Sequence, residues 1–269
     1  LSREESLEIS RIYSAAGLLT REKALFMQRP FRSPHHTVSP TAMAGGGGIP
    51  TPGEITLAHK GVLFLDELPE FKRAALEVLR QPLEAHKIYI SRVSGTYEFP
   101  ADFLLVGAMN PCPCGYYPDR NRCSCTQYQV EQYLGKLSGP LLDRFDLCTE
   151  VTDIPAKVLK TQKKGKTSLQ LRQEICRVHE IQRQRYEGTG IRFNSALSGK
   201  ETEQYCTVSK EGKKLLEAAY EKMNLSIRAY YKILKTARTI ADLDFQDTIE
   251  EEHIAQAVCY RALDKKYWK

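Results

Sequence analysis

Two short apolar runs in the first half of the chain each end in polar residues. The run Val62–Leu65 leads directly into Asp66 and Glu67, and the run Phe103–Met109 ends at Asn110. Short apolar runs bounded by glycine and proline are typical of buried parallel strands. The pattern therefore predicts two neighbouring strands of an α/β sheet, buried on both faces, with polar side chains at their carboxyl ends.

The remaining pattern predicts a hairpin and a series of helices. Residues 87–99 alternate between apolar and polar side chains and turn near Gly95, as in a hairpin. A short strand is expected at residues 147–151, and no strand pattern follows it. Helical spacing of apolar positions covers residues 4–17, 70–80, 127–137, 168–186, 209–223, 226–243 and 249–263. We thus expect an α/β part over 1–155, a basic linker over 156–167 and an all-helical part over 168–269.

Charge is unevenly distributed between the two halves. Residues 1–150 carry 16 basic and 17 acidic side chains, whereas residues 151–269 carry 23 and 16. The linker lysines Lys160, Lys163, Lys164 and Lys166 contribute to this excess. A basic half suits a polyanionic partner such as nucleic acid, although a solvated lysine-rich surface explains it equally simply.

Apolar runs and the amino terminus bear on location. No run approaches the roughly 18 apolar residues of a membrane span, and the first residues have no apolar core of a signal peptide. We therefore expect a cytoplasmic protein without a membrane partner.

Four of the eight cysteines lie within 14 positions of one another: Cys112, Cys114, Cys123 and Cys125. Without a secretory signal, a disulfide framework is not expected. Four thiolates suit a closed tetrahedral zinc site that would hold an otherwise irregular loop. The alternative is a set of reduced thiols in a surface loop, because a Cys-x-Cys spacing is less usual for zinc. His35 and His36 have no second pair of ligands nearby, so we predict no metal site there.

The acidic pair after the first strand suits nucleotide hydrolysis. Open α/β sheets bind their ligands at the carboxyl ends of the strands. Asp66 would hold Mg²⁺ there, and Glu67 would orient and polarise the attacking water. The alternative is a strand that ends in acidic turn residues.

These features together resemble the AAA+ ATPases, in particular the magnesium-chelatase-like YifB/ComM family. The strand with Asp66 and Glu67 resembles a Walker B box, and Asn110 stands where the family has its sensor 1 residue. The longest matching segments read RPFRSPHH at residues 29–36, PGEITLAHKGVLFLDELPEF at 52–71, AMNPCPCG at 108–115 and LSGPLLDRFD at 137–146. The resemblance extends over essentially the whole chain and implies an AAA+ core with an incomplete parallel sheet flanked by helices, followed by a helical lid.

The resemblance also implies roles for two arginines. Arg144 matches an arginine finger that neutralises transition-state charge in a neighbouring subunit. Alternatively, it forms surface ion pairs with Asp143 and Asp146. Arg228, near the start of a helix, matches the sensor 2 residue that contacts the ATP phosphates, and Arg238 competes with it for that role.

For the intact protein, the resemblance implies ATP and Mg²⁺ as cofactors and a homo-oligomer, a hexamer in this family. ATP hydrolysis would drive helicase-like branch migration of DNA during recombination or transformation. A second possibility is the motor subunit of a magnesium chelatase. A third is a non-enzymatic, zinc-stapled module for DNA binding or assembly.

One departure from the family changes the expectation for this chain. The family's glycine-rich phosphate loop lies ahead of the first helix, and no Gly-Lys-Ser or Gly-Lys-Thr occurs here; Gly45–Gly48 is not followed by one. The chain also has no match to the family's amino-terminal domain. We expect a fragment that begins after the phosphate-loop helix, hydrolyses no ATP by itself and lacks a central strand of the sheet.

Four cations are candidate DNA phosphate contacts: Lys87 and Arg92 on the predicted hairpin, and Arg29 and Arg32 in the segment before it. The resemblance implies that both regions face the pore of the oligomer. Tyr89 could stack on a base.

Overall fold

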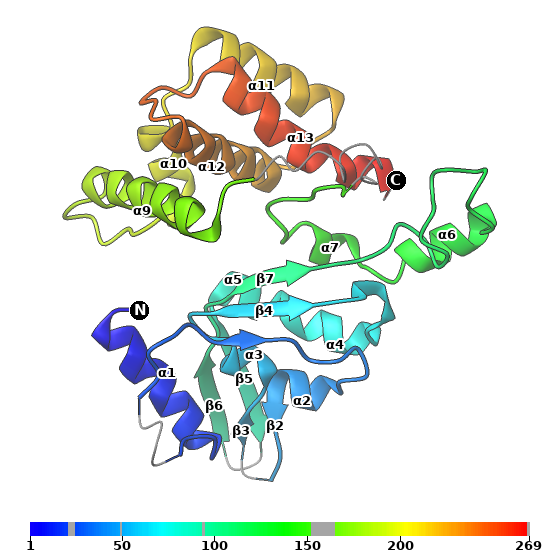
Figure 1. Ribbon diagram of the computed structural model, residues 1–269, viewed down its shortest axis with the longest axis vertical. Helices are drawn as coiled ribbons and strands as arrows, with labels where there is room; N and C mark the ends of the chain where they lie inside the picture. Colours follow the sequence, from blue (N-terminus) through cyan, green and yellow to red (C-terminus); the bar gives the residue numbers. More distant parts are fainter. Residues whose placement is uncertain (21–24, 49, 93–94, 152–164, 268–269) are drawn as a thin grey trace. The chain divides into compact units, whose positions relative to one another are not determined.

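The computed structural model describes residues 1–20, 25–48, 50–92, 95–151 and 165–267, and the chain divides into two compact units (Figure 1). The first unit is Leu1–Phe145 and the second is Asp146–Tyr267. Most of the predicted linker, with Lys160, Lys163 and Lys164, lies outside the described residues. The boundary expected near residue 155 also falls there and stays a prediction.

A three-stranded parallel sheet is the centre of the first unit. Its strands are β1 (Phe31–Arg32), β4 (Val62–Leu65) and β7 (Leu104–Gly107), in the order β1-β4-β7. The three strands pair directly, so there is no gap between them. Our expectation of a sheet that lacks a central strand stays a prediction, since β1 and β7 are ordinary edge strands of the described sheet.

The two faces of this sheet differ, which corrects the prediction of strands buried on both faces. Leu63 and Leu65 are fully buried in the core that the helices of this unit form. On the opposite face, Phe64 is half-buried, and Phe31 and Leu104 are 64% and 62% exposed. Parallel sheets are normally covered on both faces. The second face of this sheet, by contrast, is largely exposed to solvent among the described residues.

The helices of the first unit are short, apart from the first. The bounds are α1 Arg3–Ala15, α2 Pro40–Ala44, α3 Glu54–Leu57, η1 Leu68–Glu70, α4 Arg73–Glu77, η2 Val78–Arg80, α5 Pro82–Ala85, α6 Gln127–Leu134 and α7 Gly139–Leu142. The helix predicted at residues 70–80 is found as α4 followed directly by the 3₁₀ turn η2, and Glu70 ends the separate 3₁₀ turn η1. The first helix begins with a capping box of Ser2 and Glu5.

Two antiparallel pairs complete the unit. The predicted hairpin is present as β5 (Lys87–Arg92) and β6 (Gly95–Pro100). A smaller pair, β2 (Gly45–Gly46) with β3 (Thr51–Pro52), was not predicted. It requires glycine at Gly45, where φ is +97° and a Cβ atom would lie 2.5 Å from the Thr51 carbonyl oxygen.

The second unit is entirely helical, as predicted. Its elements are α9 Ser168–Arg185, η3 Asn194–Ala196, α10 Gly199–Tyr205, α11 Lys210–Lys222, α12 Ile227–Leu243 and α13 Glu251–Tyr267. Helix α10 was missed because seven residues show too little periodicity. The predicted strand at 147–151 is wrong: these residues have no strand pairing, and the Cys148 amide donates to the Tyr260 carbonyl of α13 instead. The last helix begins at Glu251, later than expected, and His253 Nδ1 accepts from the Glu250 amide at its start.

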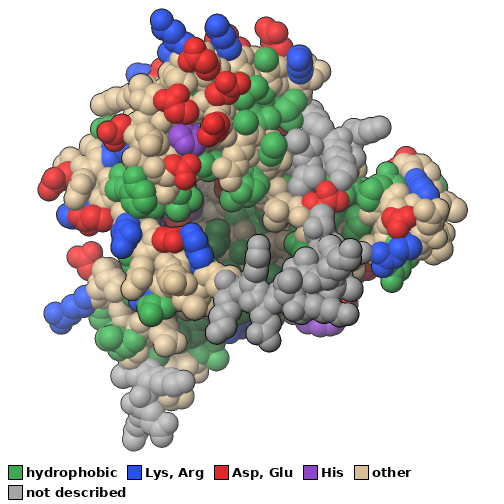
Figure 2. All heavy atoms as spheres, turned by 45° about the horizontal axis from the view of Figure 1, so that its top comes forward, with side chains coloured by type: hydrophobic (Ala, Val, Ile, Leu, Met, Phe, Trp, Pro, Cys, Tyr) green, Lys and Arg blue, Asp and Glu red, His purple; other side chains and the backbone are tan. Residues whose placement is uncertain are grey.

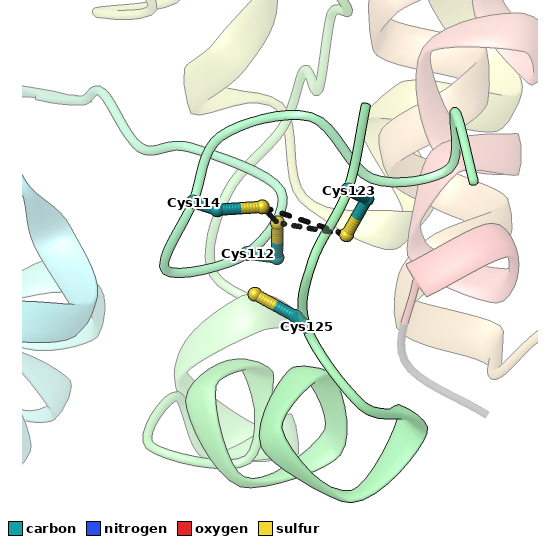
Figure 3. Close-up of side chains that lie close together, drawn as sticks. All are labelled: Cys112, Cys114, Cys123 and Cys125. Carbon is teal, nitrogen blue, oxygen red and sulfur yellow. Dashed lines mark hydrogen bonds between the residues drawn. The ribbon is translucent and has the colours of Figure 1, made fainter. Parts of the chain in front are cut away.

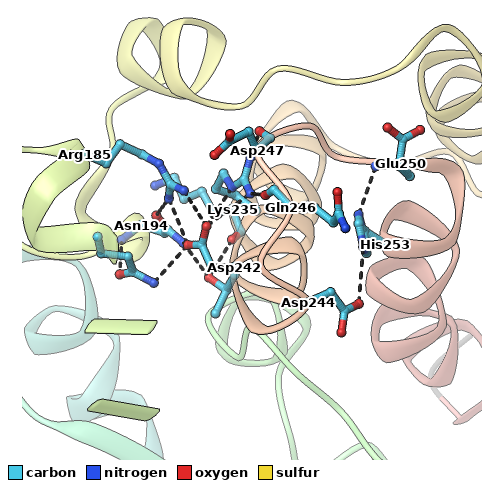
Figure 4. A network of polar contacts seen from close by, with 12 residues as sticks. Arg185, Asn194, Lys235, Asp242, Asp244, Gln246, Asp247, Glu250 and His253 are labelled. Carbon is cyan, nitrogen blue, oxygen red and sulfur yellow. Dashed lines mark hydrogen bonds and ion pairs between the residues drawn. The ribbon is translucent and has the colours of Figure 1, made fainter. Parts of the chain in front are cut away.

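A buried polar network fastens the second unit around Asp242 of α12 (Figure 4). Its carboxylate accepts from Arg185 at 2.5 and 2.9 Å, from Arg238 at 3.1 Å and from Asn194 at 2.8 Å. The side chain of Asp242 is completely buried, and that of Arg238 is 1% exposed. One buried carboxylate therefore pairs with two guanidinium groups from different helices.

In the described part of the chain, no helix is long and apolar enough to cross a membrane.

Replacing Asp242 by alanine should destabilise the helical unit by about 3–5 kcal/mol, because it leaves buried positive charge unpaired. The free energy of unfolding from urea titration, followed by circular dichroism, measures the effect. Asp244→Ala is the matched control. Its carboxylate is 62% exposed, so the loss should stay below about 1 kcal/mol. Equal losses in the two variants would contradict this assignment.

Candidate functional site

The polar residues predicted at the strand ends lie on adjacent strands. Leu65 of β4 is in register with Gly107 of β7. The ladder continues past the strands: the Ala108 amide donates to the Leu65 carbonyl at 2.9 Å, and the Leu68 amide donates to the Ala108 carbonyl at 3.0 Å. Asp66 and Glu67 therefore flank Ala108, and Asn110 follows two residues later. The pairing places all three at the same end of the sheet.

The backbone turns sharply at the acidic pair. Glu67 adopts a left-handed conformation with φ of +52°, which is uncommon for a residue other than glycine. The Asp66 carboxylate accepts from the Glu67 amide at 2.9 Å and so stabilises the turn. The Glu67 side chain is 60% exposed. A carboxylate held out at a strained turn, beside a second carboxylate, is an arrangement suited to binding a cation and a polar ligand.

His36 is a member of this site that sequence reasoning missed. Its Nδ1 lies 3.0 Å from the Glu67 carboxylate, and its ring lies 4.0 Å from the ring of His35. The five residues from Arg32, in β1, to His36 carry the chain past the end of β4. The signal that could have found His36 was the strand order, since β1 is the parallel neighbour of β4.

Arg144 lies in the first unit, and residues of the same unit hold its guanidinium. Its guanidinium contacts the Glu84 carboxylate at 2.9 Å and donates to the carbonyl oxygens of Arg80, at 3.0 Å, and Pro140. Its side chain is 10% exposed. The Glu84 carboxylate is an ion-pair partner that the sequence analysis did not consider.

The two arginines of α12 differ in surroundings. Arg238 is buried and belongs to the network of Asp242, so it is a structural residue of the helical unit. Arg228 is exposed in the first turn of the helix, after the N-cap Ser226. Of the two, Arg228 is therefore the one accessible to a ligand.

The four clustered cysteines converge (Figure 3). All four sulfur atoms lie within 4.8 Å of one another. The Sγ atom of Cys112 is 3.4 Å from that of Cys114 and 3.8 Å from that of Cys123, and the Cys114–Cys123 distance is 3.5 Å. Four sulfurs bound to Zn²⁺ at 2.3 Å would be about 3.8 Å apart. A backbone hydrogen bond with Tyr116 lowers the pKa of the Cys114 thiol to about 5, whereas burial raises the pKa of the Cys123 thiol. The donor set and spacing fit a tetrahedral thiolate site.

Most of the cations proposed to contact DNA are paired with carboxylates. Lys87 lies 2.7 Å from Glu98, Arg32 forms two bonds of 2.7 Å to Glu54, and Arg29 lies 3.4 Å from Glu5.

Arg92 differs from these three cations, because it donates to the carbonyl oxygens of Gly47 and Ser91. Lys166, at the end of the linker, lies 2.8 Å from Glu174. On the face shown in Figure 2, acidic and basic side chains are interspersed.

Comparison with known proteins agrees with this architecture. A family model described as magnesium chelatase, subunit ChlI, matches residues 1–159, and the model of its C-terminal region matches residues 165–261. The fold is an AAA+ core followed by a helical lid, and the chain belongs to the magnesium chelatase ChlI family.

Relatives with other names resemble the chain over most of its length. It is 46% identical over 266 residues to the uncharacterized protein YifB of Salmonella typhimurium, covering 98% of this chain and 51% of that protein. It is 49% identical over 237 residues to the competence protein ComM of Haemophilus influenzae, covering 88% and 46%. The magnesium-chelatase 38 kDa subunit of Acidiphilium rubrum is 28% identical over 120 residues, covering 44% and 29%. The chain spans about half the length of the YifB and ComM relatives.

Arg144→Ala should lower the stability of the first unit by about 1–3 kcal/mol in the isolated chain, because it removes a mostly buried guanidinium from three partners. Urea unfolding measures this. Arg73→Ala, on the exposed side of α4, is the control and should change stability by less than about 0.5 kcal/mol. An Arg144 that served only a neighbouring subunit would leave the isolated chain as stable as the wild type.

Proposed function

We propose that this chain carries the hydrolytic half of an AAA+ ATPase site, and the observation that carries the proposal is the adjacency of the Asp66–Glu67 pair and Asn110. Asp66 ligates the Mg²⁺ of bound MgATP. Glu67 accepts a proton from the attacking water, and Asn110 orients that water. Membership of the magnesium chelatase family supports this activity.

The two remaining arginines act on the phosphates. Arg228, exposed at the start of α12, contacts the phosphates of ATP as sensor 2. Arg144 acts across the interface of a homo-oligomer, a hexamer by resemblance. Reaching a neighbour's nucleotide requires Arg144 to exchange Glu84 and two carbonyl oxygens for phosphate oxygens. The finger role therefore involves a rearrangement on assembly.

The proposed work of the hydrolysis is helicase-like remodelling of branched DNA in the cytoplasm, supported by the likeness to a competence protein. The likeness to a magnesium-chelatase subunit supports a second candidate, a motor for metal insertion. Branch-migration assays on a longer protein that includes this chain separate the two. A non-enzymatic DNA-binding module is the third, and DNA binding without nucleotide would favour it.

We further propose that Cys112, Cys114, Cys123 and Cys125 hold a structural Zn²⁺. The mutual distances of the sulfur atoms support this assignment. No disulfide joins these cysteines, so all four thiols remain available as ligands.

The chain alone should show no ATP turnover, because it has no phosphate loop. In a longer protein that carries the loop, Glu67→Gln should lower kcat by about 10²–10⁴-fold and leave nucleotide binding intact. Phosphate release and binding of a fluorescent nucleotide measure the two quantities. Glu70→Gln, whose carboxylate pairs with Lys136, should retain activity. Turnover by the chain alone, or an active Glu67→Gln protein, would refute the proposal.

DNA binding should depend on Arg92 more than on the ion-paired cations. Arg92→Glu should weaken binding and reduce the slope of log K against log salt by about 1 for each DNA phosphate that the protein no longer neutralises. Fluorescence anisotropy with labelled single-stranded DNA measures the slope. Lys222→Glu, on an exposed helix end, is the charge-matched control. Unchanged binding by the Arg92 variant would exclude the hairpin from DNA recognition.

Protein purified without chelator should contain one zinc ion per chain, measured by elemental analysis. Cys125→Ser should lose the metal because three thiolates bind it far more weakly than four. Cys176→Ser, an exposed cysteine on α9, should retain it. A metal content near zero in the wild-type protein would leave the cysteines as reduced thiols.

A further inference from the structure

The cysteine loop begins directly after Asn110 and returns to it. Cys112 follows Asn110 after a single proline and is fully buried. The loop then turns back at Gly115, where φ is +85° and a Cβ atom would lie 3.9 Å from Cγ of Asn110. The chain therefore passes directly over the Asn110 side chain before it reaches the second pair of cysteines.

Helix α6 closes the loop from the other side. It starts at Gln127, two residues after Cys125, with a capping box of Thr126 and Gln129. Tyr133, near its end, is 7% exposed, and the nearby backbone of Asn110 partly offsets the rise in its pKa that burial causes. The metal ligands and Asn110 are thus joined both through Pro111 and through this helix.

The turn after this helix reaches the segment that follows the acidic pair. Lys136, two residues past the end of α6, lies 3.2 Å from the Glu70 carboxylate of η1. Burial raises the pKa of Tyr133 to about 12, and the charges of Glu70 and Glu67 contribute to the rise.

The rest of the loop is held by turns and local contacts. Between Cys112 and Cys125 the described residues form turns without helix or strand, and most of their side chains are exposed. The Tyr117 amide donates to Cys112 Sγ at 3.4 Å, the Cys123 amide donates to the Asp119 carbonyl at 2.8 Å, and Arg120 donates to the Gln127 side chain at 2.7 Å. A cation bound by four sulfurs would be the strongest constraint on where α6 starts.

We propose that a thiophilic divalent cation at the four cysteines positions Asn110 by fixing α6, so that the metal site sets the geometry of the catalytic end of the sheet. The cysteines and Tyr133 are positioning residues in this assignment, and none of them touches the nucleotide. The inference rests on the proposed function for its consequence, but the positioning itself is a property of the chain without ATP.

Asparagine-selective ¹⁵N labelling tests this positioning directly. The chain has four asparagines: Asn110 in the site, Asn121 within the loop, and Asn194 and Asn224 in the helical unit. Spectra are recorded for protein stripped of metal under reducing conditions and again after addition of Zn²⁺. Asn110→Asp and Asn121→Asp assign the signals of the first unit.

Zinc should shift or sharpen the backbone and side-chain signals of Asn110 and Asn121, and leave those of Asn194 and Asn224 unchanged. Tyr133→Phe should keep its zinc and still displace the Asn110 backbone signal, because the phenol oxygen near the Asn110 backbone is removed. Cys125→Ser should give the metal-free spectrum whether or not zinc is added, whereas Cys176→Ser should respond as the wild type does.

Two outcomes would overturn the proposal. If zinc binds and changes only the signals of Asn121, the metal stabilises the loop locally and does not position Asn110. If no zinc binds, the four cysteines hold no cation. Because the wild-type titration needs no substitution, an unstable Tyr133 variant does not prevent the test. An inactive ATPase with a zinc-dependent Asn110 signal would refute the proposed function and leave the positioning intact.

Discussion

The parallel pairing of β4 with β7 is the constraint on which the candidate site depends. Backbone bonds on both sides of Ala108 extend the ladder beyond the strands to Leu65 and Leu68. Side chains that stand 44 positions apart in the sequence, Asp66 and Asn110, are thereby held at one edge of the sheet. A shift of one residue in this register would send the side chains to the opposite face and bury polar groups in the core.

The site is assembled on a sheet that is covered on one side only. Leu63 and Leu65 are anchored in the core, while Phe31 and Leu104 on the other face remain exposed. The strained Glu67 turn is stabilised by Asp66 and His36. The acidic pair is therefore fixed by backbone pairing and local contacts, and not by burial of the acids themselves.

Local ion pairs decide which cations are available to a ligand. Lys87, Arg29 and Arg32 lie against carboxylates of their own unit, and Arg144 is held by Glu84. Arg238 is committed to Asp242 in the helical unit. A basic composition thus overstates the positive surface, because a paired cation contributes little to attraction at a distance.

The sequence by itself determined the class of the elements. Apolar runs that end in Asp66, Glu67 and Asn110 indicated the strands and the edge at which they meet, and helical spacing predicted α9, α11, α12 and α13 closely. Those signals are local, because burial on one face imposes a fixed period on the residues of one element. The cysteine spacing likewise indicated a group of four thiols, and the structure brings their sulfur atoms within 4.8 Å of one another.

Only the tertiary structure decided which residues from distant segments contact one another. It joined His36 to Glu67, gave Arg144 a carboxylate from α5, and replaced the expected strand at 147–151 by a contact with α13. These partners are separated by 31 to more than 100 positions, and many pairings of that separation satisfy the same local pattern. The choice among them rests on packing and charge neutralisation across the whole unit, which no short segment of sequence encodes.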